Sequence, residues 1–295
     1  MIHIIVNPSA GKGKALSAAK KTAEILTAKN MKCEVHETKR PMHAKEIAES
    51  CVKNSETSAI YCVGGDGTVH EVVWGMAGSD VPFALIPAGS GNDFALSLKN
   101  YKNKDTQKLV ESFILGNTEK IDVIRCKTGN EVYYCANIAS FGLDAEIVEN
   151  AEKYKEKLGK FAYLASTLSS ILRYEKKKLK ITANGTEIDG FITLTAICNG
   201  KVYGGGFNIS PSAKINDGKI TLCVIKEMKK AAMSVLFPSV LFGLHKYIGA
   251  VSFTDCERVK AEFNGNLQLN IDGNIYPAKD SAEFEIVRNA LTVLV

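Results

Sequence analysis

The sequence predicts a mixed α/β fold, with an N-terminal α/β domain on a parallel sheet and a β-rich antiparallel domain after it. In residues 1–124, short apolar runs alternate with helical patterns, an order typical of parallel sheets. Beyond Asp122–Asn130, alternating strands are separated by turns such as Asn184-Gly185, which favours antiparallel pairing. We therefore expect domains at 1–124 and 125–287, and a C-terminal strand at 288–295 that can return to the first domain.

Composition allows a soluble protein with two hydrophobic cores. The chain has 295 residues, 45% hydrophobic and 23% charged, as in ordinary globular proteins. Its net charge is +5, and the stretch from Glu152 to Lys180 alone holds nine basic and three acidic residues. A localised basic patch of this kind fits an anionic surface, either membrane lipid or nucleic acid.

The cysteines and the apolar runs indicate a cytoplasmic location. Eight cysteines are scattered without a Cys-x-x-Cys pair, which predicts a reducing compartment and neither a disulfide framework nor a zinc site. The first strand begins at the initiator methionine and leaves no room for a signal peptide. The longest nearly apolar run, Ala231–Leu244, is too short to span a bilayer and contains Pro238. Peripheral contact with the inner face of the membrane stays compatible with this pattern.

The first element is a strand, Ile2–Val6, followed by a Gly/Lys turn at Asn7–Lys14 and a helical pattern. This turn is a candidate phosphate cradle. It is not a Walker A loop, because Val6 stands where that motif needs glycine and Gly13 replaces its Ser/Thr. Taken alone, the turn could equally be an ordinary basic connection between a strand and a helix.

A second glycine turn follows the strand Ala59–Val63. Before it we predict a strand at Lys32–Glu37, ending at Thr38, and a helix at His43–Lys53. Glycines let the backbone approach a ligand closely, and the free N–H groups of the helix that follows favour an anion. Asp66, in the middle of this turn, would repel a bare phosphate, so Mg²⁺ is the expected intermediary. The turn therefore predicts a metal–nucleotide site.

A third glycine turn, Pro87–Ala95, follows the strand predicted at Pro82–Ile86. Ligands of parallel sheets gather at the carboxyl ends of strands, so the polar residues of the three turns should converge on one crevice. These residues are Ser9, Lys12, Asp66, Thr68, Ser90, Asn92 and Asp93.

The second half is predicted to be mostly strands, after a strand at Glu119–Cys126 that carries Asp122. Two helical stretches interrupt it, from Ala145 to about Tyr174 and from Lys229 to about Tyr247. The predicted strands are Val132–Ser140, Leu179–Ala183, Ile188–Cys198, Phe207–Ser210, Lys219–Ile225, Arg258–Phe263, Leu267–Ile271 and Ala282–Val287.

Taken in order, these motifs resemble the diacylglycerol kinase catalytic-domain family in its bacterial lipid-kinase branch. The resemblance extends over nearly the whole chain. The Gly-Gly-Asp-Gly-Thr element is also similar to one in NAD kinases, but the ordered set is far more specific. The matching pieces are Asn7–Gly13, Gly64–Thr68 with Glu71, Pro87–Ala95, Phe141–Ala145, Asn199-Gly200, Gly204–Gly206, Asp217-Gly218 and Asp272-Gly273.

The resemblance implies a three-layer α/β nucleotide domain and a β-sandwich-like domain, with the site in the cleft between them. It implies a structural Mg²⁺ near Asp217, with backbone oxygens of Lys214 and Lys219. Asp93 and Asp122 match family carboxylates that organise the active site; without the resemblance, an Asx-turn cap and a satisfied strand-end acid would be the commoner explanations. The residues implied to hold ATP are Asn7, Ser9, Gly11, Lys12, Thr38, Gly64, Gly65, Gly67, Thr68, Glu71, Ser90 and Asn92.

One position departs from the family pattern. In the lipid kinases a Glu usually follows this Asp-Gly pair and is assigned as the base, whereas here Asn274 follows Asp272-Gly273. An amide cannot accept a proton at neutral pH. Asp66 or Asp272 could take the role of the base, phosphoryl transfer could need little base assistance, or the protein could bind nucleotide without efficient turnover.

The remaining motifs say less about the function of the protein. Trp74 replaces the second histidine of a zincin helix, and none of the five histidines stands at ligand spacing from a Cys or Asp. The basic amphipathic segment Lys153–Lys180 is either a helix covering the sheet or a contact for anionic lipid. The apolar residues of 233–244 are either core or the wall of an acyl pocket. Nucleic acid is not expected, because the basic segment lacks interleaved aromatic residues.

We therefore expect an ATP- and Mg²⁺-dependent kinase that phosphorylates a lipid hydroxyl, with diacylglycerol or a close relative as substrate. The lipid would be presented at a membrane or micelle surface. Two alternatives stay open: NAD kinase-type phosphorylation of a soluble hydroxyl, and a nucleotide- or lipid-binding protein with an inactive site. A homodimer is compatible with the sequence but is not required by it.

Overall fold

The computed structural model describes residues 1–99, 105–148, 170, 174 and 177–295, and the chain forms two compact units. Most of the predicted helix from Ala145 to Tyr174 and of the basic segment Lys153–Lys180 lies outside the described residues. Within the described ranges, no helix is both long and apolar enough to cross a bilayer. Unit 1 contains Met1–Val123, Ile215–Asp217 and Val287–Val295, and unit 2 contains Ile124–Lys214 and Gly218–Ile286.

The core of unit 1 is a parallel sheet. Its strands β1 to β4 follow one another in the sequence with helices between them, and the end of β13 joins them when Val293 pairs with Phe83. The order across the sheet is β13–β4–β3–β1–β2, so β2 is an edge strand. The first four strands are β1 (Ile2–Val6), β2 (Cys33–Glu37), β3 (Ala59–Gly64) and β4 (Phe83–Pro87).

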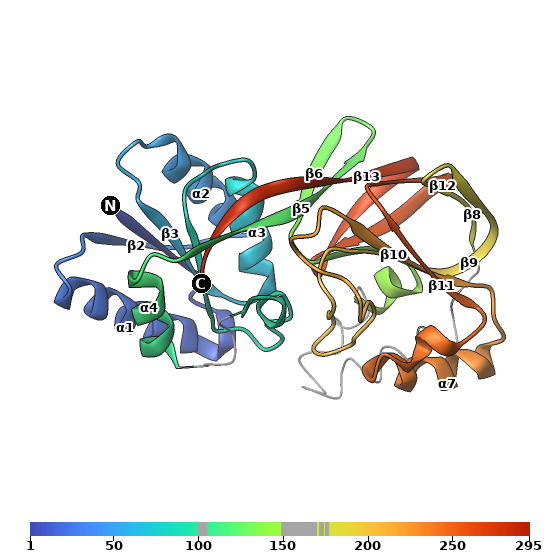
Figure 1. Cartoon of the computed structure of the whole chain (residues 1–295), viewed down its shortest axis with the longest axis horizontal. Helices are drawn as coiled ribbons and strands as arrows, with labels where there is room; N and C mark the ends of the chain where they lie inside the picture. The colour runs from blue at the N-terminus through green and yellow to red at the C-terminus, as the bar shows by residue number, and fades with distance from the viewer. Residues whose placement is uncertain (100–104, 149–169, 171–173, 175–176) are drawn as a thin grey trace. The chain divides into compact units, whose positions relative to one another are not determined.

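Helices cover both faces of this sheet, which makes unit 1 three-layered (Figure 1). Alternate residues of a strand point to opposite faces. Ile2, Ile4 and Val6 therefore share the face that packs against α1 and α4, while His3 and Ile5 point to the opposite face. That face is covered by α2 and α3, which pack against each other. The helices are α1 (Lys14–Ala28), α2 (His43–Lys53), α3 (Asp66–Met76) and α4 (Thr106–Ile114).

Unit 2 is built from antiparallel strands. The long strands β9 and β12 each pair with β8 along one half and with β7 along the other, so the sheet divides into two parts. This division produces the sandwich-like form and confirms the predicted fold class. Its strands are the second part of β5 (Thr118–Thr128), β6 (Glu131–Cys135), β7 (Ile138–Gly142), β8 (Lys177–Ala183), β9 (Thr186–Cys198), β10 (Ile220–Lys226), β11 (Val251–Cys256), β12 (Arg258–Ile271) and the first part of β13 (Asn274–Leu294).

One helix, α7 (Lys230–Leu241), covers the face formed by β7, β9 and β10. Leu236 and Val240 on this helix pack against Leu194 and Ile225 of the sheet. A short 3₁₀ turn, η4 (Leu244–Tyr247), follows after Gly243, whose φ of 67° reverses the chain. The helix therefore closes the apolar side of unit 2.

Some predicted strands were wrong in extent. The run Val132–Ser140 divides into β6 and β7, because the N–H groups of Ala136 and Asn137 bond the Asp272 carboxylate instead of a neighbouring strand. The predicted strands Arg258–Phe263 and Leu267–Ile271 form one continuous strand, β12, with an irregularity between Glu262 and Asn266. Phe207–Ser210 forms only an isolated bridge from Phe207 to Tyr203, and three glycines with left-handed φ precede it. Strand β11 and helix α4 were not predicted from the sequence.

Candidate functional site

The three glycine turns of unit 1 lie against one another. The Asn7 N–H donates to the Val63 carbonyl oxygen at 3.3 Å, and the Ala88 N–H donates to the Gly64 oxygen at 2.8 Å. A Cβ atom on Gly65 would lie 3.0 Å from the Cα atom of Gly89. The backbones are thus too close for side chains to separate them. The structure brings together the turns after β1, β3 and β4, at the carboxyl ends of these strands.

The first turn presents polar groups to solvent. Gly11, Lys12 and Gly13 all have left-handed φ values, of 60°, 57° and 88°. The carbonyl oxygen of the Asn7 side chain accepts hydrogen bonds from the Ser9 N–H at 3.1 Å and the Ser9 hydroxyl at 2.8 Å. Lys12 is exposed, and α1 begins directly afterwards. Free N–H groups at a helix start and a lysine ammonium together form a suitable cradle for an anion.

Gly11 offers a test of this cradle. A Cβ atom on Gly11 would lie 2.0 Å from the Ala88 oxygen, whereas a Cβ atom on Gly13 would meet nothing within 4 Å. Both residues have left-handed φ, so Gly11→Ala and Gly13→Ala share the conformational cost and differ in the clash. We expect Gly11→Ala to weaken ATP binding at least about tenfold, and Gly13→Ala to weaken it much less. Isothermal titration with ATP measures both, and equal losses would contradict a close-packed cradle.

Asp66, in the second turn, forms hydrogen bonds with backbone groups of the third turn. Its Oδ2 accepts the Asn92 N–H at 2.7 Å, and its Oδ1 accepts the Phe94 N–H at 3.3 Å. A Cβ atom on Gly91 would lie 2.9 Å from Asp66 Oδ2 and 3.5 Å from Asp93 Oδ2, so the two carboxylates face the same spot. Carboxylate oxygens are the ligands that Mg²⁺ prefers. The donor set at Asp66 and Asp93 therefore fits a magnesium ion.

Glu71 makes contacts that the sequence did not suggest. Its two carboxylate oxygens accept the N–H groups of Met42 at 2.9 Å and Ala44 at 3.0 Å. These groups belong to the first turn of α2, where no side chain of the helix itself provides a cap. Glu71 thus caps α2 from α3, and its predicted contact with ATP stays a prediction.

The remaining residues assigned to ATP lie in or beside the turns. The Thr38 N–H donates to the Val6 oxygen at 2.9 Å, which places the end of β2 beside the end of β1. Thr68 is buried under Gly64, where a Cβ atom would lie 2.5 Å from the Thr68 hydroxyl oxygen. Gly67 and Ser90 are exposed on their turns. Contact of these residues with ATP stays a prediction.

Asp122 joins three separate segments of unit 1. It is buried, its Oδ1 accepts the Asn289 N–H at 2.8 Å, and its own N–H donates to the Ile215 oxygen at 2.7 Å. Asp122 thereby links the segment Ile215–Asp217, which belongs to unit 1, to strands β5 and β13. Lys214, Asp217 and Lys219 are exposed on the turn around it. Their predicted binding of a structural metal ion stays a prediction.

Asp272, in unit 2, anchors the connection between β6 and β7. Its Oδ1 accepts the N–H groups of Asn137 at 2.9 Å and Ile138 at 3.1 Å and lies 3.1 Å from the Cys135 thiol. Its Oδ2 accepts the Ala136 N–H at 2.8 Å. Three donors surround Oδ1 and a fourth bonds Oδ2, so both oxygens are engaged within unit 2. Asp272 therefore has a structural role, and its catalytic role stays a prediction.

Asp144 is a site residue to which the sequence analysis gave no role. It is fully buried, and its Oδ2 accepts hydrogen bonds from the Ser140 hydroxyl and, at 2.8 Å, from the Asn270 amide. Desolvation raises the pKa of the Asp144 carboxyl, although bonds from Ser140, Asn270 and Tyr203 act in the opposite direction. An acid inside the apolar run 138–145 was the signal in the sequence.

Asp144 also lines a cavity between α7 and the sheet of unit 2. The other walls are almost entirely apolar and include Leu143, Leu194, Ile225 and Leu236. Asp144 Oδ1 is buried and has no hydrogen-bond partner within the described part of the chain. A ligand in this cavity would thus meet hydrocarbon walls and one carboxyl oxygen able to bond it.

The chain is similar to known kinases over its whole length. Residues 1–126 match the model of the diacylglycerol kinase catalytic domain, and residues 137–295 match the YegS C-terminal NAD kinase beta sandwich-like domain. A diacylglycerol kinase of Mycobacterium tuberculosis is 29% identical, over 99% of this chain and 94% of the relative. A probable lipid kinase YegS-like of Shewanella frigidimarina is 29% identical, over 77% and 73%.

A crystal structure from Bacillus anthracis str. Sterne has the same fold, with a TM-score of 0.81 and 24% identity, over 99% of this chain and 94% of that one. The two family models do not overlap and together match all residues except 127–136. The paired domains and the three glycine turns lead to one assignment. The chain belongs to the diacylglycerol kinase family with the YegS-type C-terminal domain, and it is a kinase.

Proposed function

We propose that this kinase transfers the γ-phosphoryl group of ATP to the hydroxyl of a lipid, with diacylglycerol as the favoured substrate, in a reaction that depends on Mg²⁺. The observation that carries the proposal is the convergence of three glycine turns around Asp66. Close-packed backbone, a helix start and a carboxylate pair are the parts that phosphate and magnesium need.

Each turn of unit 1 would contribute a different function. Backbone N–H groups of the first turn and the Lys12 ammonium would bind phosphate oxygens and neutralise their charge. Asp66 and Asp93 would hold the magnesium ion, which when bound supplies electrostatic stabilisation of the transferring phosphoryl group. The Asp66 hydrogen bonds to Asn92 and Phe94 would keep the carboxylate in position before the nucleotide arrives. Preorganisation of this kind is the main contribution available to phosphoryl transfer.

The lipid part of the proposal is supported by unit 2 and by the relatives. The cavity beside α7 offers an apolar wall to acyl carbon atoms and the Asp144 carboxyl to a polar group near them. Burial raises the pKa of this carboxyl, and an oxygen of a carboxyl group in such a cavity can form a hydrogen bond with a polar group of the lipid. The names diacylglycerol kinase and lipid kinase among the relatives point to the same class of acceptor.

Asn274 remains the feature that argues for slow turnover. Its amide lies near the carbonyl oxygens of Ile271 and Asp272, at 3.5 and 3.4 Å, in the turn between β12 and β13. It offers no base there. We therefore propose that Asp66 receives the hydroxyl proton or that the loose transition state needs little base assistance.

One assay tests the proposal against its alternatives. Purified protein is supplied with γ-labelled ATP and Mg²⁺ in detergent micelles that contain diacylglycerol, a sphingoid base or phosphatidylglycerol, and separately with NAD. We expect label to appear in the lipid fraction, most strongly with diacylglycerol. Transfer to NAD alone would refute the lipid assignment, and ATP binding without any transfer would favour an inactive site.

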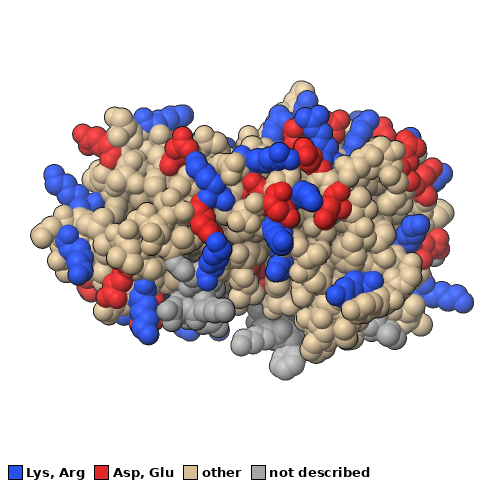
Figure 2. All heavy atoms as spheres, viewed as in Figure 1, with Lys and Arg blue, Asp and Glu red and all other residues tan. Residues whose placement is uncertain are grey.

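We further propose that the end of α7 contacts the lipid surface. Phe242, Leu244 and Tyr247 are 75%, 52% and 76% exposed, and the Lys246 ammonium lies 5.0 Å from the centre of the Tyr247 ring. Exposed apolar groups beside a lysine match the boundary of an anionic bilayer. On the face shown in Figure 2, basic and acidic side chains are interspersed without a field of one sign.

The double variant Phe242→Ser, Tyr247→Ser should reduce co-sedimentation with anionic vesicles at least about fivefold, because two exposed aromatic anchors are lost. Leu115→Ser is a matched control, since Leu115 is 76% exposed and lies at the C-terminal end of α4, in unit 1. Binding of the wild type should weaken as salt rises, through loss of the lysine contribution. Equal binding of all three proteins would exclude this surface.

A further inference from the structure

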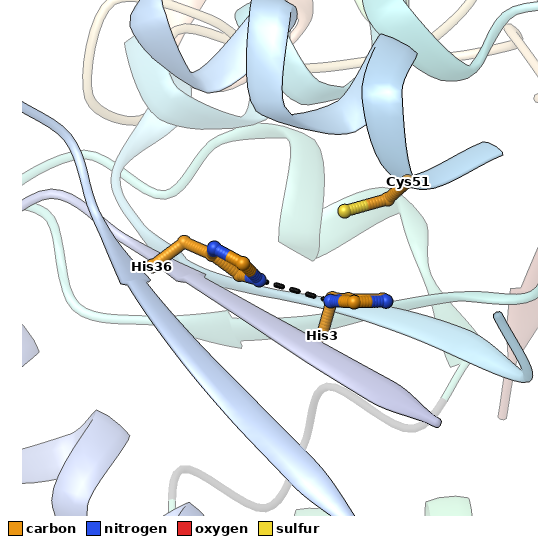
Figure 3. Close-up of side chains that lie close together, drawn as sticks. All are labelled: His3, His36 and Cys51. Atoms are coloured by element: carbon orange, nitrogen blue, oxygen red, sulfur yellow. Dashed lines mark hydrogen bonds between the residues drawn. The ribbon is translucent and has the colours of Figure 1, made fainter. Parts of the chain in front are cut away.

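Two histidines and a cysteine meet on the face of the unit 1 sheet that α2 covers. His3 Nδ1 lies 2.9 Å from His36 Nε2, and ligand atoms of His3, His36 and Cys51 all lie within 4.8 Å of one another. Figure 3 shows the Cys51 sulfur reaching from α2 toward the two imidazole rings. The Glu34 carboxylate stands at the same place, with Oε2 3.8 Å from each of these ring nitrogens.

The register of the sheet creates this cluster. Strands β1 and β2 are parallel, and His3 is paired with Glu34. His36 is two residues further along β2, so it points to the same face as Glu34. Cys51 is a buried residue near the end of α2, the helix that packs on this face. Residues separated by up to 48 positions are thus brought together by two strands and one helix.

The chemistry of the set is that of a transition-metal site. Two imidazoles, a thiol and a carboxylate are the ligand types of tetrahedral zinc centres. His3 is 4% exposed, and its second ring nitrogen has no hydrogen-bond partner within the described ranges. All polar interactions found for His3 therefore lie toward His36 and Glu34. We propose that His3, His36 and Cys51, with Glu34 as the fourth ligand, form a structural Zn²⁺ site.

The observed distances are close to those that zinc requires. Two imidazole nitrogens bound tetrahedrally at about 2.0–2.1 Å lie roughly 3.3 Å apart. The two nitrogens of His3 and His36 would have to separate by a few tenths of an ångström, and the half-buried His36 on an edge strand can move by that amount. The Glu34 oxygen would have to approach, which its 53% exposed side chain permits.

This site is distinct from the phosphate cradle. His3 precedes Asn7 by four residues, about 13 Å of strand at 3.3 Å per residue. Its ligands are nitrogen, sulfur and one carboxylate, which suit zinc, whereas magnesium prefers oxygen. Cys51 is 5% exposed, so its thiol is poorly accessible to a reactant from solvent. A metal that clamps β1, β2 and α2 together explains the set better than a reactive cysteine.

The test is a zinc titration of the full-length protein after it has been stripped with a chelator. We expect one Zn²⁺ per chain to be taken from a chromogenic chelator. Cys51→Ala and His36→Gln should each weaken this binding at least about tenfold. With Co²⁺ as the probe, the wild type should show a thiolate-to-cobalt charge-transfer absorption that Cys51→Ala lacks. Zinc should also raise the melting temperature of the wild type and leave that of Cys51→Ala unchanged.

Cys33→Ala is the matched control, because Cys33 begins the same strand as Glu34 and His36 but points to the opposite face. It should bind zinc like the wild type. His36→Gln provides a second test of the site if Cys51→Ala does not fold, because His36 is only half-buried and its replacement should disturb the fold less. Absence of stoichiometric binding, equal affinity in Cys51→Ala and Cys33→Ala, or a cobalt spectrum without thiolate absorption would each overturn the proposal.

Discussion

Replacing Asp66 by asparagine should lower the rate of phosphoryl transfer at least about a hundredfold. The variant keeps the size of the side chain and removes its charge. It thereby weakens the binding of a magnesium ion shared with Asp93 and removes the group that we propose as proton acceptor. Rates measured at saturating ATP and lipid should show the loss in kcat, because the first glycine turn can still bind the nucleotide.

A loss of stability accompanies this change and has to be separated from it. Asp66 accepts one N–H group on each oxygen, from Asn92 and from Phe94. Asparagine has one acceptor oxygen, so one of these bonds is replaced by an N–H group facing an N–H group. A hydrogen bond to a charged group contributes about 1.5–3 kcal/mol, and the free energy of unfolding should fall by about that amount or less. Denaturant unfolding of the variant measures it.

The matched control is Asp105→Asn. Asp105 is also a carboxylate of unit 1 that accepts a backbone N–H, from Gln107 at 3.0 Å, at the start of α4. It stands outside the glycine turns, so its loss should lower stability slightly and leave kcat unchanged. If Asp66→Asn keeps more than about a tenth of the wild-type rate, the carboxylate only holds the turns together through hydrogen bonds and is not part of the catalytic machinery.

The convergence of the turns was predictable because it follows from topology alone. Alternating strands and helices give a parallel sheet, and the ends of parallel strands meet at one edge. Glycines after β1, β3 and β4 then indicate where backbones approach closely, as Gly65 and Gly89 do. Periodicity also sufficed for the position of most strands, since alternate residues show which face is buried.

The hydrogen bonds that the site carboxylates form with distant backbone groups were not predictable from the sequence. Glu71 caps a helix that begins 28 residues earlier, and Asp272 binds N–H groups more than 130 residues away. Neither partner has a side chain that reveals the contact, because the donors are backbone groups shared by all residues. The same interactions explain why Val132–Ser140 is not one strand.

The histidine–cysteine cluster was missed for a related reason. Ligand spacing within single segments predicted no zinc site, whereas His3, His36 and Cys51 belong to three elements. Two signals could have found it. One signal is that Glu34 and His36 are polar residues two positions apart, and so on one face of their predicted strand, while His3 interrupts the first strand. The other is a cysteine on the helix that follows.

Replacing Asp272 by asparagine should act mainly on stability. Asparagine tolerates the left-handed φ of 49° at this position, so the variant keeps the backbone and removes the charge. The asparagine side chain has one acceptor oxygen, whereas the wild-type carboxylate uses two oxygens to accept the N–H groups of Ala136, Asn137 and Ile138. At least one buried N–H group loses its partner, and we expect the free energy of unfolding to fall by about 2–4 kcal/mol.

The control is Asp280→Asn, since Asp280 also has left-handed φ, 62°, but accepts a single backbone N–H, from Gly265 at 3.1 Å. It should cost about 1 kcal/mol or less. Kinetic measurements on Asp272→Asn, made well below its melting temperature, separate the two roles of this residue. Both oxygens of the wild-type carboxylate already accept hydrogen bonds within unit 2, so we expect kcat to fall less than about tenfold. A fully folded variant with a hundredfold lower kcat would instead identify Asp272 as the base that Asn274 cannot be.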